Sequence, residues 1–301
     1  MSLLVTGSIG IDTVTTPYGV SEECLGGSSV YFSMAASFFA PVRFLGVIGP
    51  DCPFDLAEVF AGRDVDLTGL EVRQQSKTFR WKGTYSDNMD DRRTDCLELN
   101  VLAEAPPTVP AEYEDSEFVF LANTAPALQI QLLQQVQEPV FVAADTMDCW
   151  IKDELDDLKQ LLNKIDCLII NDSEARMLAD EHNLIKAAEK ILDMGPTVVI
   201  IKKGESGSMV CKAGGERFIL PAYPASEVKD PTGAGDSFAG GFMGYLAQVG
   251  KTDFDSLKTA VAYGTVVASF TIADFSLAGL TSISKTDIDS RFETLREVTR
   301  F

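Results

Sequence analysis

A twelve-residue segment near the carboxyl end of the chain, from Asp230 to Gly241, has residue types suited to holding an anion. Pro231 and the small residues after it do not continue a preceding helix, whereas apolar residues recur at helical spacing from Phe238 onward. We therefore expect Gly233-Ala234-Gly235 to form the turn that begins a helix. Because these side chains are minimal, the backbone N–H groups can approach an anion, and the helix dipole favours negative charge there. A transferring phosphoryl group is such an anion.

Asp236 follows this turn and falls in the first turn of the predicted helix. A carboxylate there can accept the proton of a hydroxyl group that attacks a phosphoryl group bound at the turn. The alternative is that Asp236 only complements the positive end of the helix dipole. That alternative leaves the other residues of the segment unexplained, so the pattern favours phosphoryl transfer with Asp236 as the general base.

Two more polar segments follow predicted strands. Asn171-Asp172-Ser173-Glu174 comes directly after an apolar run, and Glu174 can offer a hard oxygen to a Mg²⁺-bound water. The same tetrapeptide is also typical of an ordinary helix cap. The segment from Lys203 to Gly207, taken alone, is a plausible hairpin turn.

The elements that must position these residues are short apolar runs alternating with helical patterns. Such alternation predicts an α/β fold, a doubly wound and mostly parallel sheet covered on both faces, with its active site beyond the carboxyl ends of the strands. We expect two further strands at 208–211 and 217–220, and two long helices at 235–249 and 256–270 that close the chain. The earlier strands are expected at 3–5, 44–48, 118–121, 140–143, 167–170 and 197–201, and the earlier helices at 30–39, 128–136, 151–165, 173–180 and 184–194.

Two polar segments interrupt this alternation, at about 12–25 and 72–102. The second has strand-like alternation from Thr78 to Val101 with a charged turn. We expect both to form a small antiparallel β flap attached to the main sheet. The whole chain, 1–301, is then expected to be a single domain with this flap as its lid.

The net charge of -20, from 45 acidic and 25 basic residues, argues against nucleic acid as a partner. The densest basic sites, Arg92-Arg93 and Lys202-Lys203, are pairs and not patches. An acidic field would also oppose an anionic substrate such as ATP, so any phosphate site must rely on local amides, a few cations or Mg²⁺.

The sequence contains one histidine, His182, in a polar segment expected to be a solvated loop. Ser-His-Asp hydrolysis, Cys-His proteolysis and multi-histidine metal sites are thus disfavoured. The six cysteines are widely spaced and are expected to be free thiols in a reducing compartment. With no signal-peptide pattern and no apolar run long enough to span a bilayer, we expect a cytoplasmic protein without a membrane partner.

The segment from Asp230 to Gly241 resembles the carboxy-terminal signature of the ribokinase (PfkB-type) carbohydrate kinases, which reads D-[TP]-T-G-A-G-D-x-F. The resemblance implies an ATP-dependent kinase with Asp236 as general base and Gly233, Ala234 and Gly235 as the anion hole. Asp230 and Thr232 match positions that in several family members help to bind a monovalent cation such as K⁺. Asn171 and Glu174 match the family's N-x-x-E motif, which governs the environment of Mg²⁺ and the phosphates. Lys203, Gly204 and Gly207 match its ATP-binding turn.

On the acceptor side, the same resemblance implies that Asp12 holds substrate hydroxyl groups and that Gly26-Gly27 is the hinge between lid and core. The family's following asparagine is replaced by Tyr31, which changes the expected shape of the substrate. Asp145 keeps the aspartate of a family D-x-N-x-R run without its asparagine and arginine. We therefore expect a neutral sugar or sugar-like substrate. Family lids often pair between subunits, so a homodimer through the lid is also expected.

Several alternatives remain open at this stage. A nucleoside kinase of the same fold is the second substrate class, since aromatic residues Phe79, Trp81 and Tyr85 could line a pocket for a base. A non-catalytic sugar or nucleotide sensor would not need Asp236. A dinucleotide-dependent oxidoreductase lacks the third glycine of its fingerprint after the first strand, and no P-loop motif occurs.

Overall fold

The computed structural model describes residues 1–89 and 92–300. Its main sheet has the strand order β13-β12-β11-β10-β9-β8-β1-β4-β5, parallel except for the antiparallel β12 and β13. This confirms the predicted doubly wound, mostly parallel sheet. The strands are β1 (Leu3–Thr6), β4 (Val42–Ile48), β5 (Val65–Val72), β8 (Phe118–Leu121), β9 (Phe141–Asp145), β10 (Cys167–Asn171), β11 (Val198–Lys202), β12 (Ser208–Lys212) and β13 (Arg217–Leu220).

The central strands are apolar at successive positions because both faces of the sheet are covered by helices. Leu3 and Val5 face one core cluster, whereas Leu4 between them faces the other. The first cluster includes residues of α1 (Ser28–Ala36), α2 (Leu56–Val59), α8 (Ala234–Val249), α9 (Phe254–Thr271), α10 (Ala278–Thr281) and α11 (Lys285–Val298). The second includes residues of α4 (Asp148–Asp153), α5 (Leu155–Leu162), α6 (Asp172–Ala179) and α7 (Leu184–Leu192), along with Leu132 of α3 (Pro126–Leu133).

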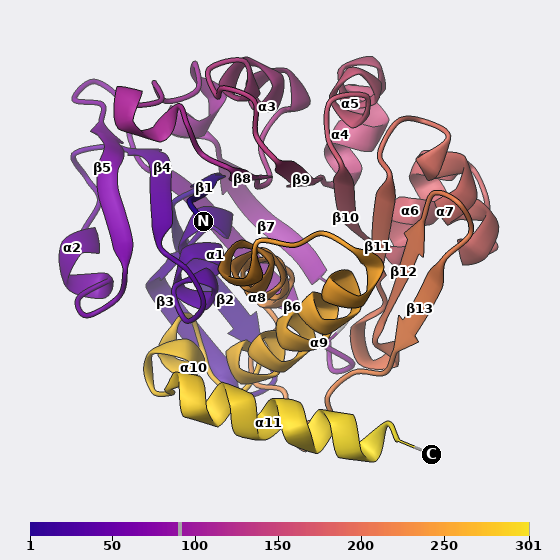
Figure 1. Ribbon diagram of the computed structural model, residues 1–301. Coiled ribbons are helices and arrows are strands. Elements are labelled where there is room, and N and C mark those ends of the chain that lie inside the picture. Colours follow the sequence, from indigo (N-terminus) through magenta and orange to yellow (C-terminus); the bar gives the residue numbers. More distant parts are fainter. Residues whose placement is uncertain (90–91, 301) are drawn as a thin grey trace.

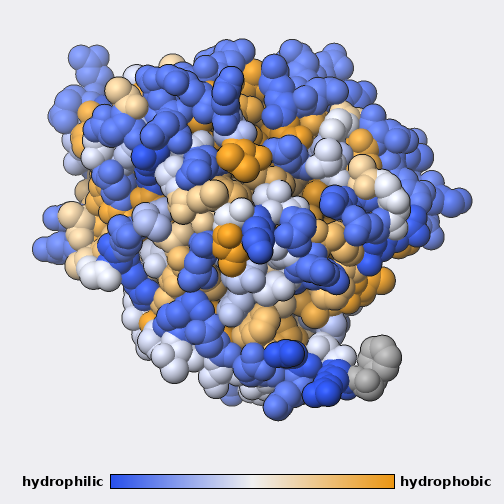
Figure 2. All heavy atoms as spheres, viewed as in Figure 1, coloured by the Kyte–Doolittle hydropathy of each residue, from blue (hydrophilic) through white to orange (hydrophobic). Residues whose placement is uncertain are grey.

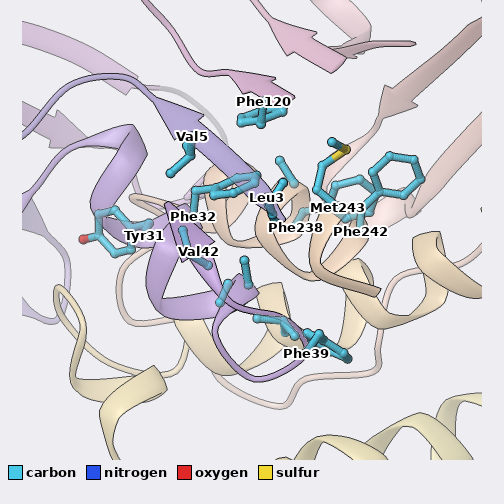
Figure 3. Packing of buried hydrophobic residues seen from close by; sticks show 14 of the residues in the cluster. Leu3, Val5, Tyr31, Phe32, Phe39, Val42, Phe120, Phe238, Phe242 and Met243 are labelled. Atoms are coloured by element: carbon cyan, nitrogen blue, oxygen red, sulfur yellow. The ribbon is translucent and has the colours of Figure 1, made fainter. Parts of the chain in front are cut away.

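Helix α8 packs closely against α1 and α9, and Figure 1 shows α8 and α9 in front of the sheet. A Cβ on Gly240 would lie 2.3 Å from the backbone oxygen of Phe32 in α1, so glycine is required for this approach. Phe238 and Phe242 of α8 lie in the same apolar cluster as Phe32 (Figure 3). The packing fixes the beginning of α8 relative to the strand ends.

The segments expected to form a flap supply a separate four-stranded sheet with the order β3-β2-β6-β7, called here the small sheet. Its strands are β2 (Gly10–Thr16), β3 (Gly19–Gly26), β6 (Phe79–Tyr85) and β7 (Arg92–Glu98). Each hairpin, β2-β3 and β6-β7, is antiparallel as expected. The two hairpins join through a parallel pairing of β2 with β6, which sequence alternation does not reveal.

Two sequence-based expectations about helices are wrong. The helix expected over 151–165 is two helices, α4 and α5, which are separated at Glu154 by a non-helical backbone conformation. The chain does not close on α9, because α10 and the long α11 follow it. Helix α11 buries Ile288 and Leu295 among mostly polar residues, so its apolar pattern is weak, although Ser284 and Asp287 form a capping box.

Hydrophilic side chains cover most of the face shown in Figure 2, with smaller apolar groups between them. His182 is exposed between α6 and α7, as expected, and all six cysteines are free thiols. Within residues 1–89 and 92–300, no helix is both long and apolar enough to cross a membrane. Short 3-10 helices occupy Asn100–Ala103, Ala111–Tyr113 and Gly204–Ser206.

Candidate active site

Helix α8 begins as the sequence indicates, at Ala234 after a turn at Gly233. Gly233 has φ 76° and ψ 0°, a left-handed conformation that favours glycine. No side chain caps this helix end, and the Gly235 amide has no hydrogen-bond partner among the described residues, whereas the Asp236 amide interacts only with its own carboxylate. The first turn of α8 therefore presents N–H donors together with the positive end of a helix dipole, as an anion site requires.

Tyr31 lies directly beneath this turn, Gly233-Ala234-Gly235, which is called here the anion turn. A Cβ on Gly233 would lie 2.4 Å from the ring carbons of Tyr31, so the ring fills the space next to the glycine. The side chain is only 1% exposed and belongs to the core around α1 (Figure 3). Its contact with the anion turn is clear, whereas its predicted contact with a substrate stays a prediction.

Asp236 lies in the first turn of α8 and is half-buried. Burial raises the pKa of its carboxyl group, and the positive charges of Lys202 and Arg92 act in the opposite direction. Lys202 ends β11 in the main sheet, whereas Arg92 begins β7 in the small sheet. The carboxylate of Asp236 thus experiences positive charge from residues of both sheets.

Asp145 stands at the carboxyl end of β9 and is 8% exposed. Burial raises the pKa of its carboxyl group well above the ordinary value, and the nearby charge of Asp236 adds to this effect. Its Oδ1 atom is buried without a hydrogen-bond partner in the described part of the chain. Such an oxygen is costly to bury unless a ligand supplies a donor.

Asp12 of β2 is also buried, with 4% exposure, and two glycines enclose its carboxylate. A Cβ would lie 1.8 Å from Oδ2 if it were placed on Gly26, and 2.9 Å from Oδ1 if placed on Gly10. Burial, with the charges of Asp230 and Asp236, raises the pKa of Asp12 to about 8. The Oδ1 atom of Asp12 has no partner among the described residues. Gly27, at φ 104°, would place a Cβ 2.4 Å from the backbone oxygen of Ser8.

A cavity of about 690 Å³ lies next to the anion turn. At one end it is lined by Lys202, Gly204, Gly207, Ala234 and Gly235. Its remaining wall is largely apolar and includes Tyr223, Val228, Ala268 and Ile272. An apolar chamber that ends at a glycine turn and a free helix N-terminus suits a nucleotide, with the base in the chamber and the phosphates at the turn. Lys203, the predicted ATP-binding lysine, is not among the lining residues, whereas its neighbour Lys202 is.

Asn171 and Glu174 begin α6 as a capping box. Asn171 Oδ1 accepts a hydrogen bond from the Glu174 amide at 2.8 Å, and Glu174 Oε2 accepts one from the Asn171 amide at 3.0 Å. The motif therefore does form the ordinary helix cap that its sequence also predicts. Burial raises the pKa of the Glu174 carboxyl group, and the positive charge of Lys202 acts in the opposite direction. Glu174 therefore belongs, with Asp145, Asp236 and Lys202, to one charged cluster.

Asp230 and Thr232 lie in the loop that leads into α8. Asp230 is fully buried, and its Oδ1 accepts a hydrogen bond from the Thr232 amide at 2.9 Å. Its Oδ2 accepts a longer one, of 3.4 Å, from the Ser276 amide. Among the described residues, no group of three or more His, Cys, Asp or Glu side chains is arranged to hold a metal ion.

Sequence reasoning assigned no role in this site to Lys202 or Arg92. Lys202 carried a usable signal, because it directly follows the strand predicted at 197–201, at the carboxyl edge of the sheet. Arg92 carried none, because its position depends on how the two hairpins of the small sheet pair.

Comparison with known proteins agrees with this geometry. Residues 30–282 match the pfkB family of carbohydrate kinases. A cytidine kinase of Thermococcus kodakarensis is 27% identical over 249 residues, which cover 81% of this chain and 87% of that protein. A ribokinase of Haemophilus influenzae is 26% identical over 297 residues, which cover 90% of this chain and 92% of that protein.

Solved structures share the fold over almost the full length. A nucleoside kinase of Burkholderia thailandensis, solved in complex with inosine, has a TM-score of 0.78 at 19% identity and covers 98% of each chain. A ribokinase of Thermotoga maritima has a TM-score of 0.77 at 20% identity and covers 97% of this chain and 99% of its own. The chain belongs to the pfkB family of carbohydrate kinases and is an ATP-dependent kinase.

Proposed function

We propose that the protein transfers the γ-phosphoryl group of ATP to a hydroxyl group of a small sugar or sugar-like molecule, with Asp236 as general base. One observation carries the proposal. Asp236 occupies the first turn of an uncapped helix, directly after Ala234 and Gly235, which line a nucleotide-sized cavity. Its charge also acts on the buried carboxyl groups of Asp12 and Asp145. This arrangement supports the proposed combination of a base, an anion site and acceptor-binding oxygens.

In the proposed step, Asp12 accepts hydrogen bonds from acceptor hydroxyl groups and orients one of them toward the phosphoryl group. Asp236 removes the proton of that hydroxyl as its oxygen forms a bond to the γ-phosphorus. The bond between the γ-phosphorus and the β,γ-bridging oxygen breaks, and ADP leaves with the electron pair. The amides of Gly235 and Asp236, at the start of α8, stabilise the negative charge on the transferred group.

Mg²⁺ would neutralise charge on the phosphates and is usually bound through substrate oxygens and a few carboxylates. Glu174 fits this role through a water, because it belongs to the charged cluster and follows the carboxyl end of β10. Asn171, Lys203, Gly204 and Gly207 would surround the phosphates. Asp230 and Thr232 would take part in a K⁺ site next to the anion turn.

The small sheet would act as the lid that excludes water from the transfer, because ATP hydrolysis competes with transfer in an open site. Its strand β7 is exposed at all seven positions and forms one edge of the small sheet. An open edge strand can pair with another chain, so we also propose a homodimer through this sheet. Light scattering of the purified protein at several concentrations would test the dimer, and a monomeric mass throughout would refute it.

A nucleoside is the second candidate acceptor. Related proteins named as a cytidine kinase and a nucleoside kinase favour it. In this chain Phe79 lies beside Gly10 and Asp12, and Trp81 lies two residues further along the same strand. Aromatic rings next to a hydroxyl-binding carboxylate suit a base attached to a ribose.

The test is a coupled ADP-release assay over ribose, fructose, inositol, cytidine, inosine and adenosine, with ATP and Mg²⁺ present. We expect one acceptor class to raise ADP release well above the rate without acceptor, with a phosphorylated product visible by mass spectrometry. Saturable binding of an acceptor without any product would instead identify a sensor and refute the proposal. Salt titration of a nucleic-acid binding assay would check the expected lack of affinity for polynucleotides.

A further inference from the structure

Lys202 connects the main sheet to the anion turn. It is the last residue of β11 and pairs with Asn171 of β10 on one side and Ser208 of β12 on the other. Its side chain extends to the start of α8, since a Cβ placed on Gly235 would lie 2.6 Å from its Nζ atom. The residue is half-buried and lines the cavity at the end nearest the anion turn.

The ammonium group of Lys202 forms no hydrogen bond or ion pair with any residue in the described part of the chain. Its charge nevertheless acts on three carboxylates, those of Asp145, Glu174 and Asp236. An ammonium group has three donors and is costly to hold in a partly buried place without acceptors. Its unpaired state beside the amides at the start of α8 indicates that a ligand supplies those acceptors.

We propose that Lys202 is a further catalytic residue, whose ammonium group contacts the oxygens of the transferred phosphoryl group held at the amides of Gly235 and Asp236. The proposal rests on the proposed phosphoryl transfer and deepens it. A cation held at that place by two neighbouring strands is preorganised, so it stabilises charge that develops on the phosphoryl oxygens during transfer. The chain thereby adds a fixed positive charge to a site formed otherwise by amides, carboxylates and the charge of Arg92 on the small sheet.

A purely electrostatic role is the competing explanation. In that case Lys202 would only hold Asp236 in its ionised form, because its charge lowers the pKa of that carboxyl group. The two roles separate at high pH. Once Asp236 is ionised in every variant, a role limited to its ionisation has no further effect on the rate, whereas a lost phosphoryl contact still does.

The experiment compares Lys202→Met and Lys202→Arg with the control Lys212→Met. Lys212 carries the same charge, lies on the neighbouring strand β12, and pairs with Glu216 away from the cavity. We expect Lys202→Met to lower kcat by roughly 10²–10³-fold, the usual cost of removing one preorganised donor, and to keep this deficit on the alkaline plateau of the pH profile. Lys202→Arg should recover part of the rate, and Lys212→Met should leave kcat unchanged.

A binding measurement supports the kinetic one. Isothermal titration with ADP and with a non-hydrolysable ATP analogue should show that Lys202→Met weakens binding of the analogue about tenfold more than binding of ADP, which is roughly 1.4 kcal/mol. Circular dichroism and the melting temperature establish that the variant is folded.

Three outcomes would overturn the proposal: a kcat deficit that disappears at high pH, a kcat within about twofold of wild type, or equal losses for ADP and the analogue. Failure of the phosphoryl-transfer proposal would give a distinct result, because the wild type itself would then form no product with any acceptor. The comparison of ADP with the analogue would still report whether Lys202 contacts the terminal phosphate.

Discussion

The phenolic oxygen of Tyr85 lies 3.2 Å from Oγ1 of Thr232, within hydrogen-bond distance. Tyr85 ends β6 in the small sheet, and Thr232 lies in the loop that enters α8. Tyr85 is 9% exposed, so this contact is shielded from solvent. The small sheet is therefore joined to the loop that leads into the anion turn, and we propose that this contact couples closure of the small sheet to the place where the phosphoryl group would be held.

We predict that Tyr85→Phe weakens this coupling and leaves the ring packing intact. The lost hydrogen bond should cost about 0.5–1.5 kcal/mol. Because closure excludes water, the ratio of ATP hydrolysis to phosphorylated product should rise, which the coupled assay with product quantification measures. Thr232→Val should produce the same change in that ratio. An unchanged ratio in both variants would contradict a coupling between the small sheet and the anion turn.

Asp236→Asn tests the general base most directly. The amide has nearly the same shape and cannot take a proton, so turnover should fall by roughly 10²–10⁴-fold. The melting temperature should not fall, because burial already raises the pKa of Asp236 and disfavours its charge. Steady-state kinetics with the best acceptor measures this turnover. Near-normal turnover of the variant would show that Asp236 is not the general base.

Glu174→Gln separates the helix cap from the metal role. Glutamine can also accept the hydrogen bond from the Asn171 amide, so α6 should remain capped and the protein folded. A neutral oxygen attracts Mg²⁺ and its waters less strongly than a carboxylate does. The Mg²⁺ concentration for half-maximal rate should therefore rise several-fold, and superimposable Mg²⁺ titration curves would leave Glu174 with its structural role alone.

Much of this arrangement can be predicted from the sequence, because it depends on local patterns. Apolar runs separated by helical patterns determine the parallel sheet, and the small residues around Gly233 determine a turn before a helix. The polar residues after the strands come together for the same reason, since parallel strands end at one edge. The approach of Asp145, at the end of β9, to Glu174, which follows β10, is an instance of that rule.

What the sequence does not reveal depends on contacts between distant segments. Arg92 lies close enough to lower the pKa of Asp236 because the β6-β7 hairpin is joined to β2 through the parallel pairing of β6 with β2. No local sequence pattern specifies that register. The ring of Tyr31 fills the space under Gly233 because α1 and α8 approach closely through Gly240. Helix α11 has too few apolar residues for its periodicity to stand out.

Asp12→Asn should change stability in a pH-dependent way. The folded protein holds the Asp12 proton up to about pH 8, whereas the unfolded chain releases it near the ordinary value of 3.8. Between these values the unfolded state binds fewer protons, so the wild type loses stability as the pH rises through this window. Asparagine does not ionise, so the variant has no such pH-dependent loss. In the ligand-free protein, the free energy of unfolding of Asp12→Asn should therefore rise relative to that of the wild type by about 1.4 kcal/mol per pH unit in the window.

Urea unfolding of both proteins at several pH values measures that gain. The KM for the acceptor should rise in the same variant, with the KM for ATP little changed, if Asp12 binds acceptor hydroxyl groups. A stability difference that is constant with pH would show that Asp12 is ionised in the folded protein at neutral pH.

Gly233 and Gly62 form a matched pair for testing the anion turn. Their φ values are nearly equal, 76° and 77°, so alanine meets the same backbone strain of about 1–2 kcal/mol at both positions. A Cβ at position 62 has no atom within 4 Å, whereas one at position 233 would lie 2.4 Å from the buried ring of Tyr31. Gly62→Ala should therefore cost only the backbone strain and leave kcat unchanged.

Gly233→Ala should cost about 1–3 kcal/mol more, because the ring beneath it cannot move without disturbing the core. The turn would shift instead, and the amides at Gly235 and Asp236 would lose their alignment, so kcat should fall at least about tenfold. Chemical unfolding and steady-state kinetics of the two variants check both parts. Equal losses of stability with unchanged kcat in both would mean that the turn tolerates displacement, and that the amides do not hold the phosphoryl group.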